Sequence, residues 1–278
     1  KVQPMKFRTL IASFVFTISA VFLTGQSAAY ATQAHDDAAE APYGDGWQSG
    51  DNGGSGFFPW TLNATDNAGH FIASSTGNGF GDTNGDGDID TAGATAWGMF
   101  ANSGGSAEAF RGFDQPLVRN RRFSVSMDNG FVTVDDSLRQ VGMALRTGGG
   151  TNRFEFLFIA GAANTYLIND SDIGFPSNIP FTDQGLDLAL TLTGPNTYDL
   201  LVTRVFDGVE YPFKNRTFGG TGEITNFRGF NDNAGMFESN NLYFNNLSIT
   251  SVVPEPTSFG LLAIGMTALL LSGRRRRR

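Results

Sequence analysis

The densest run of potential metal ligands is the nonapeptide DTNGDGDID, residues 82–90. Every second position carries a side-chain oxygen. These ligands are Asp82, Asn84, Asp86, Asp88 and Asp90. Gly87 takes the sixth place, where a calcium loop turns sharply, and the carboxylates would repel one another without a cation. The spacing therefore predicts a weak structural Ca²⁺ site, and the alternative is an acidic, solvated turn between strands.

The loop is not a complete EF-hand. Its twelfth place, where a bidentate carboxylate should close the coordination shell, is Gly93. No amphipathic helical pattern precedes or follows it. A cation bound here would need further oxygen ligands from elsewhere in the chain.

Side chains suited to hydrolysis are sparse. The chain has no cysteine, and His70 is the sole histidine between residues 57 and 250. No G-x-S-x-G elbow accompanies it. Glycosidases need two carboxylates that flank one bond, whereas the strand-like run RFEFLF contains Glu155 alone. We expect a protein that is not an enzyme, and the alternative is a glycan hydrolase or lyase with an unrecognised site.

Aromatic residues suggest a third possibility. Exposed Trp60 or Trp97 could stack on sugar rings and make the domain a carbohydrate-binding module. The opposing interpretation is that both tryptophans fill the space between sheets.

The elements that would position these residues are short strands. Apolar side chains recur at every second position in runs such as RFEFLFIA (153–160) and LDLALTLTG (186–194), and Gly, Asn, Asp and Pro separate the runs. No stretch from 57 to 250 keeps a helical period. This pattern predicts an all-β, two-sheet antiparallel sandwich over residues 57–250. The small, acidic residues 32–56 are expected to form a flexible leader.

The two ends of the chain have the composition of export signals. Lys6 and Arg8 precede an apolar run and the small-residue stretch QSAAYA, which predicts a signal peptide over residues 1–31 with cleavage after Ala31. At the other end, residues 251–278 combine a proline-framed triplet, an apolar stretch over 259–271 and a basic cluster. The triplet is Pro254, Glu255 and Pro256, and the cluster is Arg274, Arg275, Arg276, Arg277 and Arg278.

The apolar stretch predicts one short hydrophobic helix. Its 13 residues are fewer than the ~20 that span a bilayer comfortably. The arginines orient it with the tail end in the cytoplasm. We therefore expect transient insertion in the inner membrane, and the alternative is a permanent tail anchor.

Charge limits the partners. Without both predicted signals, 11 Lys and Arg face 26 Asp and Glu, which gives a net charge of −15. Such a surface disfavours nucleic acid and anionic lipid as partners.

Two resemblances add to this interpretation. The run from GFDQPL to YFNNLSIT resembles a concanavalin A/laminin G-like jelly roll, which implies a fold more than an activity. The triplet, span and arginine cluster, adjacent and in that order, resemble the PEP-CTERM sorting signal. That resemblance implies export from a Gram-negative bacterium and processing by an exosortase. It also implies delivery to the cell surface or extracellular matrix, in association with exopolysaccharide and biofilm.

Overall fold

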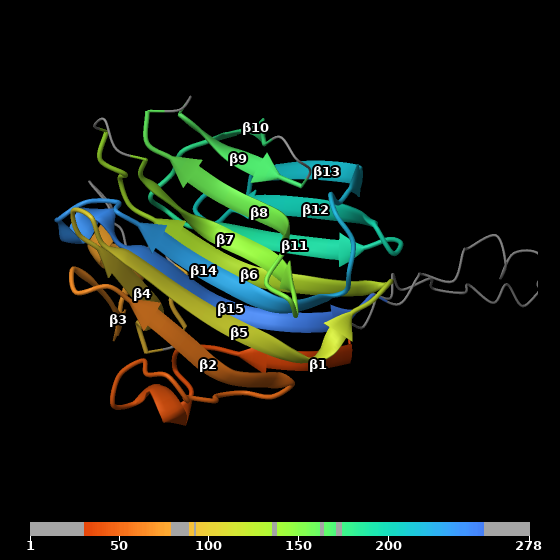
Figure 1. Ribbon diagram of the computed structural model, residues 1–278, viewed down its shortest axis with the longest axis horizontal. Coiled ribbons are helices and arrows are strands. Elements are labelled where there is room, and N and C mark those ends of the chain that lie inside the picture. The colour runs from red at the N-terminus through yellow and green to blue at the C-terminus, as the bar shows by residue number, and fades with distance from the viewer. Residues whose placement is uncertain are drawn as a thin grey trace, which may run out of the picture.

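The computed structural model describes residues 31–78, 89–91, 93–134, 138–161, 164–170 and 174–252. Within these ranges two antiparallel sheets stack face to face, and short 3-10 turns are the helical elements (Figure 1). The predicted all-β, two-sheet sandwich is confirmed. Among these residues no helix has the length and apolar character needed to cross a membrane.

The larger sheet has eight strands. Its main path is β13 (Glu210–Thr217), β12 (Thr197–Arg204), β11 (Leu186–Leu192), β6 (Arg121–Asn129), β15 (Leu242–Ser251), β4 (Ala96–Ala101) and β3 (Ala68–Ala73). The eighth strand, β1 (Ala31–Asp36), pairs with β15. One edge of β15 therefore pairs with β4 through residues 242–244 and with β1 through residues 247–251.

The second sheet has seven strands. Their order is β10 (Phe175–Pro180), β9 (Thr165–Asn169), β8 (Asn152–Ile159), β7 (Gln140–Thr147), β14 (Ile224–Asp232), β5 (Ser106–Leu117) and β2 (Phe57–Ala64). The 3-10 turns are η1 (Ala41–Tyr43), η2 (Ser75–Asn78) and η3 (Glu238–Asn240).

Alternating side chains build the core between the sheets. In β11 the four leucines at every second position are buried, and the residues between them are more exposed. Phe227 of β14 reaches across the interface to stack on Phe123 of β6, with ring centroids 5.8 Å apart, and meets Phe244 of β15 edge-on at 5.3 Å. The period-2 pattern of the sequence thus becomes a dry layer of apolar rings.

The N-terminal segment is ordered, so the predicted flexible leader over 32–56 is wrong. Tyr43 and Trp47 are buried, and the Asp36 carboxylate forms a 2.6 Å ion pair with Arg111 of β5. Gly54 has φ of +63°, and a Cβ there would lie 1.8 Å from the His35 carbonyl oxygen. The segment is held by a buried charge pair and close backbone packing, which its polar composition concealed.

Both ends of the described chain lie at one end of the sandwich, here called the exit end. Ala31 pairs with Ser251, and the backbone N–H of Val252 donates to the Asn120 carbonyl at 2.7 Å. Asn120 belongs to the turn between β5 and β6. The predicted hydrophobic helix, residues 259–271, lies outside the described residues.

Candidate functional site

The two predicted aromatic platforms lie inside the protein. Trp60 and Trp97 are 1% and 0% exposed, and their rings meet edge-on at 5.2 Å. Trp60 Nε1 also donates to the Tyr43 hydroxyl at 3.0 Å. Neither ring can stack on a ligand, so the prediction of an exposed Trp60 or Trp97 platform is wrong. The ordered N-terminal segment covers them.

The predicted calcium loop is only partly within the described residues. Asp82, Asn84, Asp86 and Asp88 lie outside them. Asp90 is described, and its two oxygens accept hydrogen bonds from Ser74 Oγ at 2.6 Å and from the Ser75 backbone N–H at 2.8 Å. In the described ranges, no group of three or more His, Asp or Glu side chains could hold a metal. Calcium binding stays a prediction.

The residues considered for catalysis have structural partners. The Glu155 carboxylate accepts hydrogen bonds from the side-chain amides of Asn152 at 2.5 Å and Asn169 at 2.6 Å. His70 Nε2 donates to the Glu108 carbonyl at 3.1 Å, and burial lowers the pKa of this imidazole. Both side chains are engaged, and they lie in different sheets.

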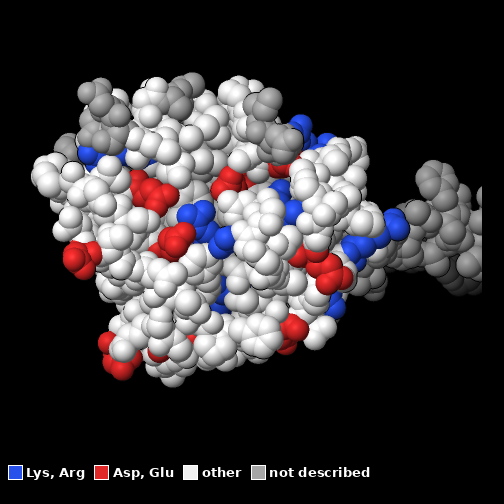
Figure 2. All heavy atoms as spheres, viewed as in Figure 1, with Lys and Arg blue, Asp and Glu red and all other residues white. Residues whose placement is uncertain are grey.

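Polar and aromatic side chains do converge on the outer face of the seven-stranded sheet. The strand register places Arg228 of β14 opposite Phe110 of β5. Two residues earlier in β14, Asn226 lies between Gly112 of β5 and Arg146 of β7. We name the outer-face cluster by its members Phe58, Glu108, Phe110, Arg146, Asn226 and Arg228. Figure 2 shows basic and acidic side chains interspersed over the middle of this face.

The two arginines of the cluster are held in place differently. Arg228 forms an ion pair with Glu108, with Nε 2.8 Å from Oε1, and its guanidinium lies 4.4 Å from the Phe230 ring centroid. Arg146 lies 5.3 Å over the Phe110 ring and donates from Nε to the Gly150 carbonyl at 3.0 Å. Burial, followed by the charge of Arg228, lowers the pKa of Arg146. The guanidiniums are pre-positioned donors with limited freedom.

An exposed ring lies at the β2 side of the same face. Phe58 is 56% exposed, and its ring lies so close over Gly112 that a Cβ there would be 3.1 Å from it. Beside Gly112, the Asn226 side-chain oxygen is shielded from solvent and accepts no hydrogen bond. A flat apolar ring and fixed guanidiniums on one face can stack on a sugar ring and bond its hydroxyls.

Glu108 and Glu155 stand too far apart to act as a glycosidase pair, and Asp232, on the strand beside Glu108, has both oxygens held by Ser106 and Gln140. Glu108 belongs to β5 and Glu155 to β8, with β14 and β7 between them. Three strand spacings separate the backbones by about 14 Å. Paired glycosidase carboxylates stand about 5–9.5 Å apart.

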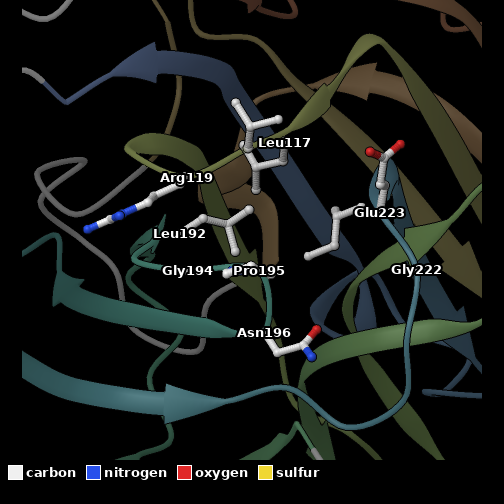
Figure 3. A pocket seen from close by; sticks show the side chains of 10 residues that line it. Leu117, Arg119, Leu192, Gly194, Pro195, Asn196, Gly222 and Glu223 are labelled. Carbon is white, nitrogen blue, oxygen red and sulfur yellow. The ribbon is translucent and has the colours of Figure 1, made fainter.

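A second concavity opens at the exit end, between the sheets. It is a cavity of about 390 Å³, with Leu117, Leu192 and Ile224 as its buried apolar wall. Arg119 and Glu223 lie at its rim and point away from one another (Figure 3). Because no polar groups converge in it, the cavity is a weaker candidate than the outer-face cluster.

A smaller cavity of about 140 Å³ lies beside Glu155 and Asp170. Its charged groups are already paired. Asp170 accepts from the Tyr198 hydroxyl at 2.6 Å and from Arg216, while Arg153 donates to the Gly219 carbonyl at 2.8 Å. These bonds hold loops together and leave little for a ligand.

The comparisons with known proteins identify one segment of the chain. The family model of the PEP-CTERM protein-sorting motif matches residues 252–277, which confirms the predicted sorting signal. No curated protein matches the chain. The triplet Pro254, Glu255 and Pro256 and the five terminal arginines lie outside the described residues.

Solved structures resemble the sandwich only distantly. A sialidase matches with a TM-score of 0.48 and 8% identity over 81% of this chain, which spans only 19% of the sialidase. The CBM2 module of the evolved Dit of Lactobacillus casei BL23 phage J-1 matches with a TM-score of 0.45 and 12% identity, over 81% of this chain and 98% of the module. Domain 4 of AbnA, a GH43 extracellular arabinanase from Geobacillus stearothermophilus, matches with a TM-score of 0.42 and 14% identity, over 82% of this chain and 96% of that one. Likenesses this distant carry no information on ligand or activity.

Proposed function

We propose that this chain, which carries a PEP-CTERM sorting motif directly behind a β-sandwich, is an exported protein of a Gram-negative bacterium. An exosortase processes its tail, and the sandwich works at the cell surface or in the extracellular matrix. The matched motif supports this proposal, as do the predicted signal peptide and the order of triplet, apolar stretch and arginines.

The sandwich itself, in this proposal, associates with extracellular polysaccharide and does not cleave it. The observation that carries this step is the outer-face cluster, where Phe58 offers an exposed ring and the Arg146 guanidinium lies on the same face. The wide spacing of Glu108 and Glu155, and the engagement of both Asp232 oxygens by Ser106 and Gln140, favour binding over hydrolysis. The cluster contains two basic groups and one acid, so it suits neutral or mildly acidic sugars.

A glycan array of the exported, processed protein tests the binding step. Phe58→Ala and Arg146→Gln should each weaken binding about tenfold, because a lost stacking or charged contact is worth about 1–2 kcal/mol. Phe206→Ala removes another exposed ring, remote from the cluster, and is the matched control. Equal binding by all three variants would contradict the assignment of the face. Release of new reducing or unsaturated sugar ends would favour the hydrolase or lyase instead.

The sorting step is tested separately. Replacing Pro254, Glu255 and Pro256 by alanine should leave the protein membrane-bound with its tail uncut, because the extended triplet presents the cleavage region. Fractionation and mass spectrometry of the C-terminus measure this. Unchanged processing in the variant would overturn the sorting proposal.

A further inference from the structure

The exit end of the sandwich is joined to the sorting tail by very little chain. Val252 is hydrogen-bonded to Asn120, and the motif begins at that same residue. Six residues, 253–258, separate it from the apolar stretch that starts at residue 259. Six residues span at most about 20 Å when fully extended. A tail inserted in a membrane would therefore keep the exit end close to the lipid headgroups.

The same end carries a concentration of positive charge. Arg119, Arg121 and Arg122 lie within four residues of one another, although the domain has only 11 basic residues in all. Arg119 is exposed and makes no hydrogen bond or ion pair with the residues described here. Val118 beside it is 46% exposed, so the turn offers both an apolar side chain and cations. Basic side chains gather at this end in Figure 2.

Acidic residues line the turns at the opposite end. They are Asp66 between β2 and β3, Asp183 before β11, Asp207 between β12 and β13, and Glu238 before β15. At the exit end, Glu223 stands across the cavity from Arg119 and partly offsets its charge. Among the described residues, the turns at the opposite end are thus more acidic than the turn of residues 118–122, although Arg204 pairs with Asp207 there. An anionic surface would attract one end and repel the other.

We propose that the turn formed by residues 118–122 lies on the anionic phospholipid headgroups of the membrane in which the tail is inserted. This docking surface rests on the proposed sorting function. It also qualifies the expectation, drawn from net charge, that the protein avoids anionic lipid. This contact orients the sandwich with its exit end toward the membrane before the tail is cut.

Fluorescence energy transfer can test this orientation, because the natural chain has no cysteine and takes single labels cleanly. Pro195→Cys places a donor at the exit end, and Phe206→Cys places one at the opposite end. The full chain is reconstituted into vesicles of phosphatidylcholine, with or without one-third phosphatidylglycerol, that carry a headgroup acceptor. We expect phosphatidylglycerol to raise transfer from position 195 and not from position 206.

Charge reversal gives the matched comparison. Arg119→Glu should lower the ratio of docked to undocked protein about 30-fold, because each basic charge near an anionic surface contributes about 1 kcal/mol and two charge units are reversed. Arg204→Glu makes the same change in net charge at the opposite end and should have no such effect. Added salt should weaken the docking in the unmodified chain.

The outcomes separate the two proposals. A chain that does not insert in vesicles of either composition would contradict the sorting function. Insertion with equal transfer from position 195 in both lipids, or equal behaviour of the two charge variants, would overturn the docking surface and leave sorting intact. Energy transfer from position 195 that rises only after an exosortase is added would also overturn the docking surface, because the exit end would then be held by a protein and not by lipid.

Discussion

Arg111 and Asp36 are charged residues placed where solvent cannot reach their side chains. Besides the 2.6 Å ion pair, Arg111 donates to the Gly53 carbonyl at 2.9 Å and lies 5.1 Å over the Trp60 ring. Asp36 accepts from the Tyr43 hydroxyl at 2.6 Å. Burial raises the pKa of Asp36 to about 6, against the opposing pull of Arg111, so the carboxylate is ionised at neutral pH. The pair joins the N-terminal segment to β5.

Arg111→Met should destabilise the protein by about 3–5 kcal/mol, because Asp36 would remain buried without its partner. Urea unfolding at pH 7.5 measures the loss. Lys214→Met removes an exposed ion pair, in which the Lys214 side chain is 62% exposed and its partner is Asp199. This variant should lower the free energy of unfolding by less than about 1 kcal/mol. A similar loss in both variants would mean that the buried pair does not hold the N-terminal segment. Adding Asp36→Leu to Arg111→Met should recover part of the stability, since no charge is then left buried.

His70 supplies a pH-dependent contribution to stability. Burial lowers its pKa in the folded protein below the ordinary value of 6.5, so folding favours the neutral ring. The contribution is complete above pH 6.5 and is lost as pH falls below that value, because protonation then favours the unfolded chain. His70→Gln keeps a donor for the Glu108 carbonyl and removes the titration.

The free energy of unfolding, measured from pH 7.5 to 5, should therefore fall less steeply in His70→Gln than in the unmodified protein. The raised pKa of Asp36 acts in the opposite sense, stabilising the fold as pH falls from 6 toward 3.8. Only the difference between the two pH profiles isolates His70. Parallel profiles would show that the ring does not titrate in the folded protein in this way.

Sequence patterns predict single residues of this protein unevenly. The alternation of leucines over 186–192 correctly predicts that they lie in the core, because period-2 burial is a local property of a strand. The burial of Trp60 and Trp97 could not be deduced, since it depends on Tyr43 and Trp47 folding over them. Asp36 meets Arg111 from 75 positions away, and no local pattern reports such a pair. The outer-face cluster likewise exists only through strand register.

Among the elements, β1 has a sequence with little strand character, yet it joins the N-terminal segment to the larger sheet. ATQAHD is small and polar, yet it pairs with β15 over its whole length, with one irregularity after Thr32. Edge pairing needs backbone hydrogen bonds more than apolar side chains. This is why composition predicted a flexible leader, and why the prediction was wrong. The alternating runs at 153–160 and 186–194, by contrast, predict β8 and β11 close to their true bounds.

Deleting residues 32–56 should abolish cooperative unfolding or lower the melting temperature by well over 10 °C. The deletion exposes Trp60 and Trp97 and leaves Arg111 without Asp36, and each such effect costs several kcal/mol. Differential scanning calorimetry of the deleted and intact proteins measures it. Tolerance of the deletion, with an unchanged melting temperature, would restore the flexible-leader interpretation.

For the molecule as a whole, calcium is the outstanding prediction from sequence. If the loop of residues 82–90 binds Ca²⁺, calcium at ten times its dissociation constant should stabilise the fold by about 1.4 kcal/mol. Thermal unfolding with calcium and with chelator measures the shift, and Asp86→Asn/Asp88→Asn should remove it. Magnesium serves as the control cation, because it prefers a smaller octahedral site. An equal melting temperature with calcium and chelator would leave the loop as a solvated turn.

The place of β15 has a consequence for biogenesis. It is the last strand of the sandwich along the chain, yet it lies inside its sheet, paired with β6 on one side and with β4 and β1 on the other. Thr32 must find Thr250 across nearly the full length of the domain, the kind of distant pairing that slows folding. In an exported chain the sheet cannot close until residues 242–251 have crossed the membrane. By then the apolar stretch has entered the translocation channel, so folding finishes with the tail already at the bilayer.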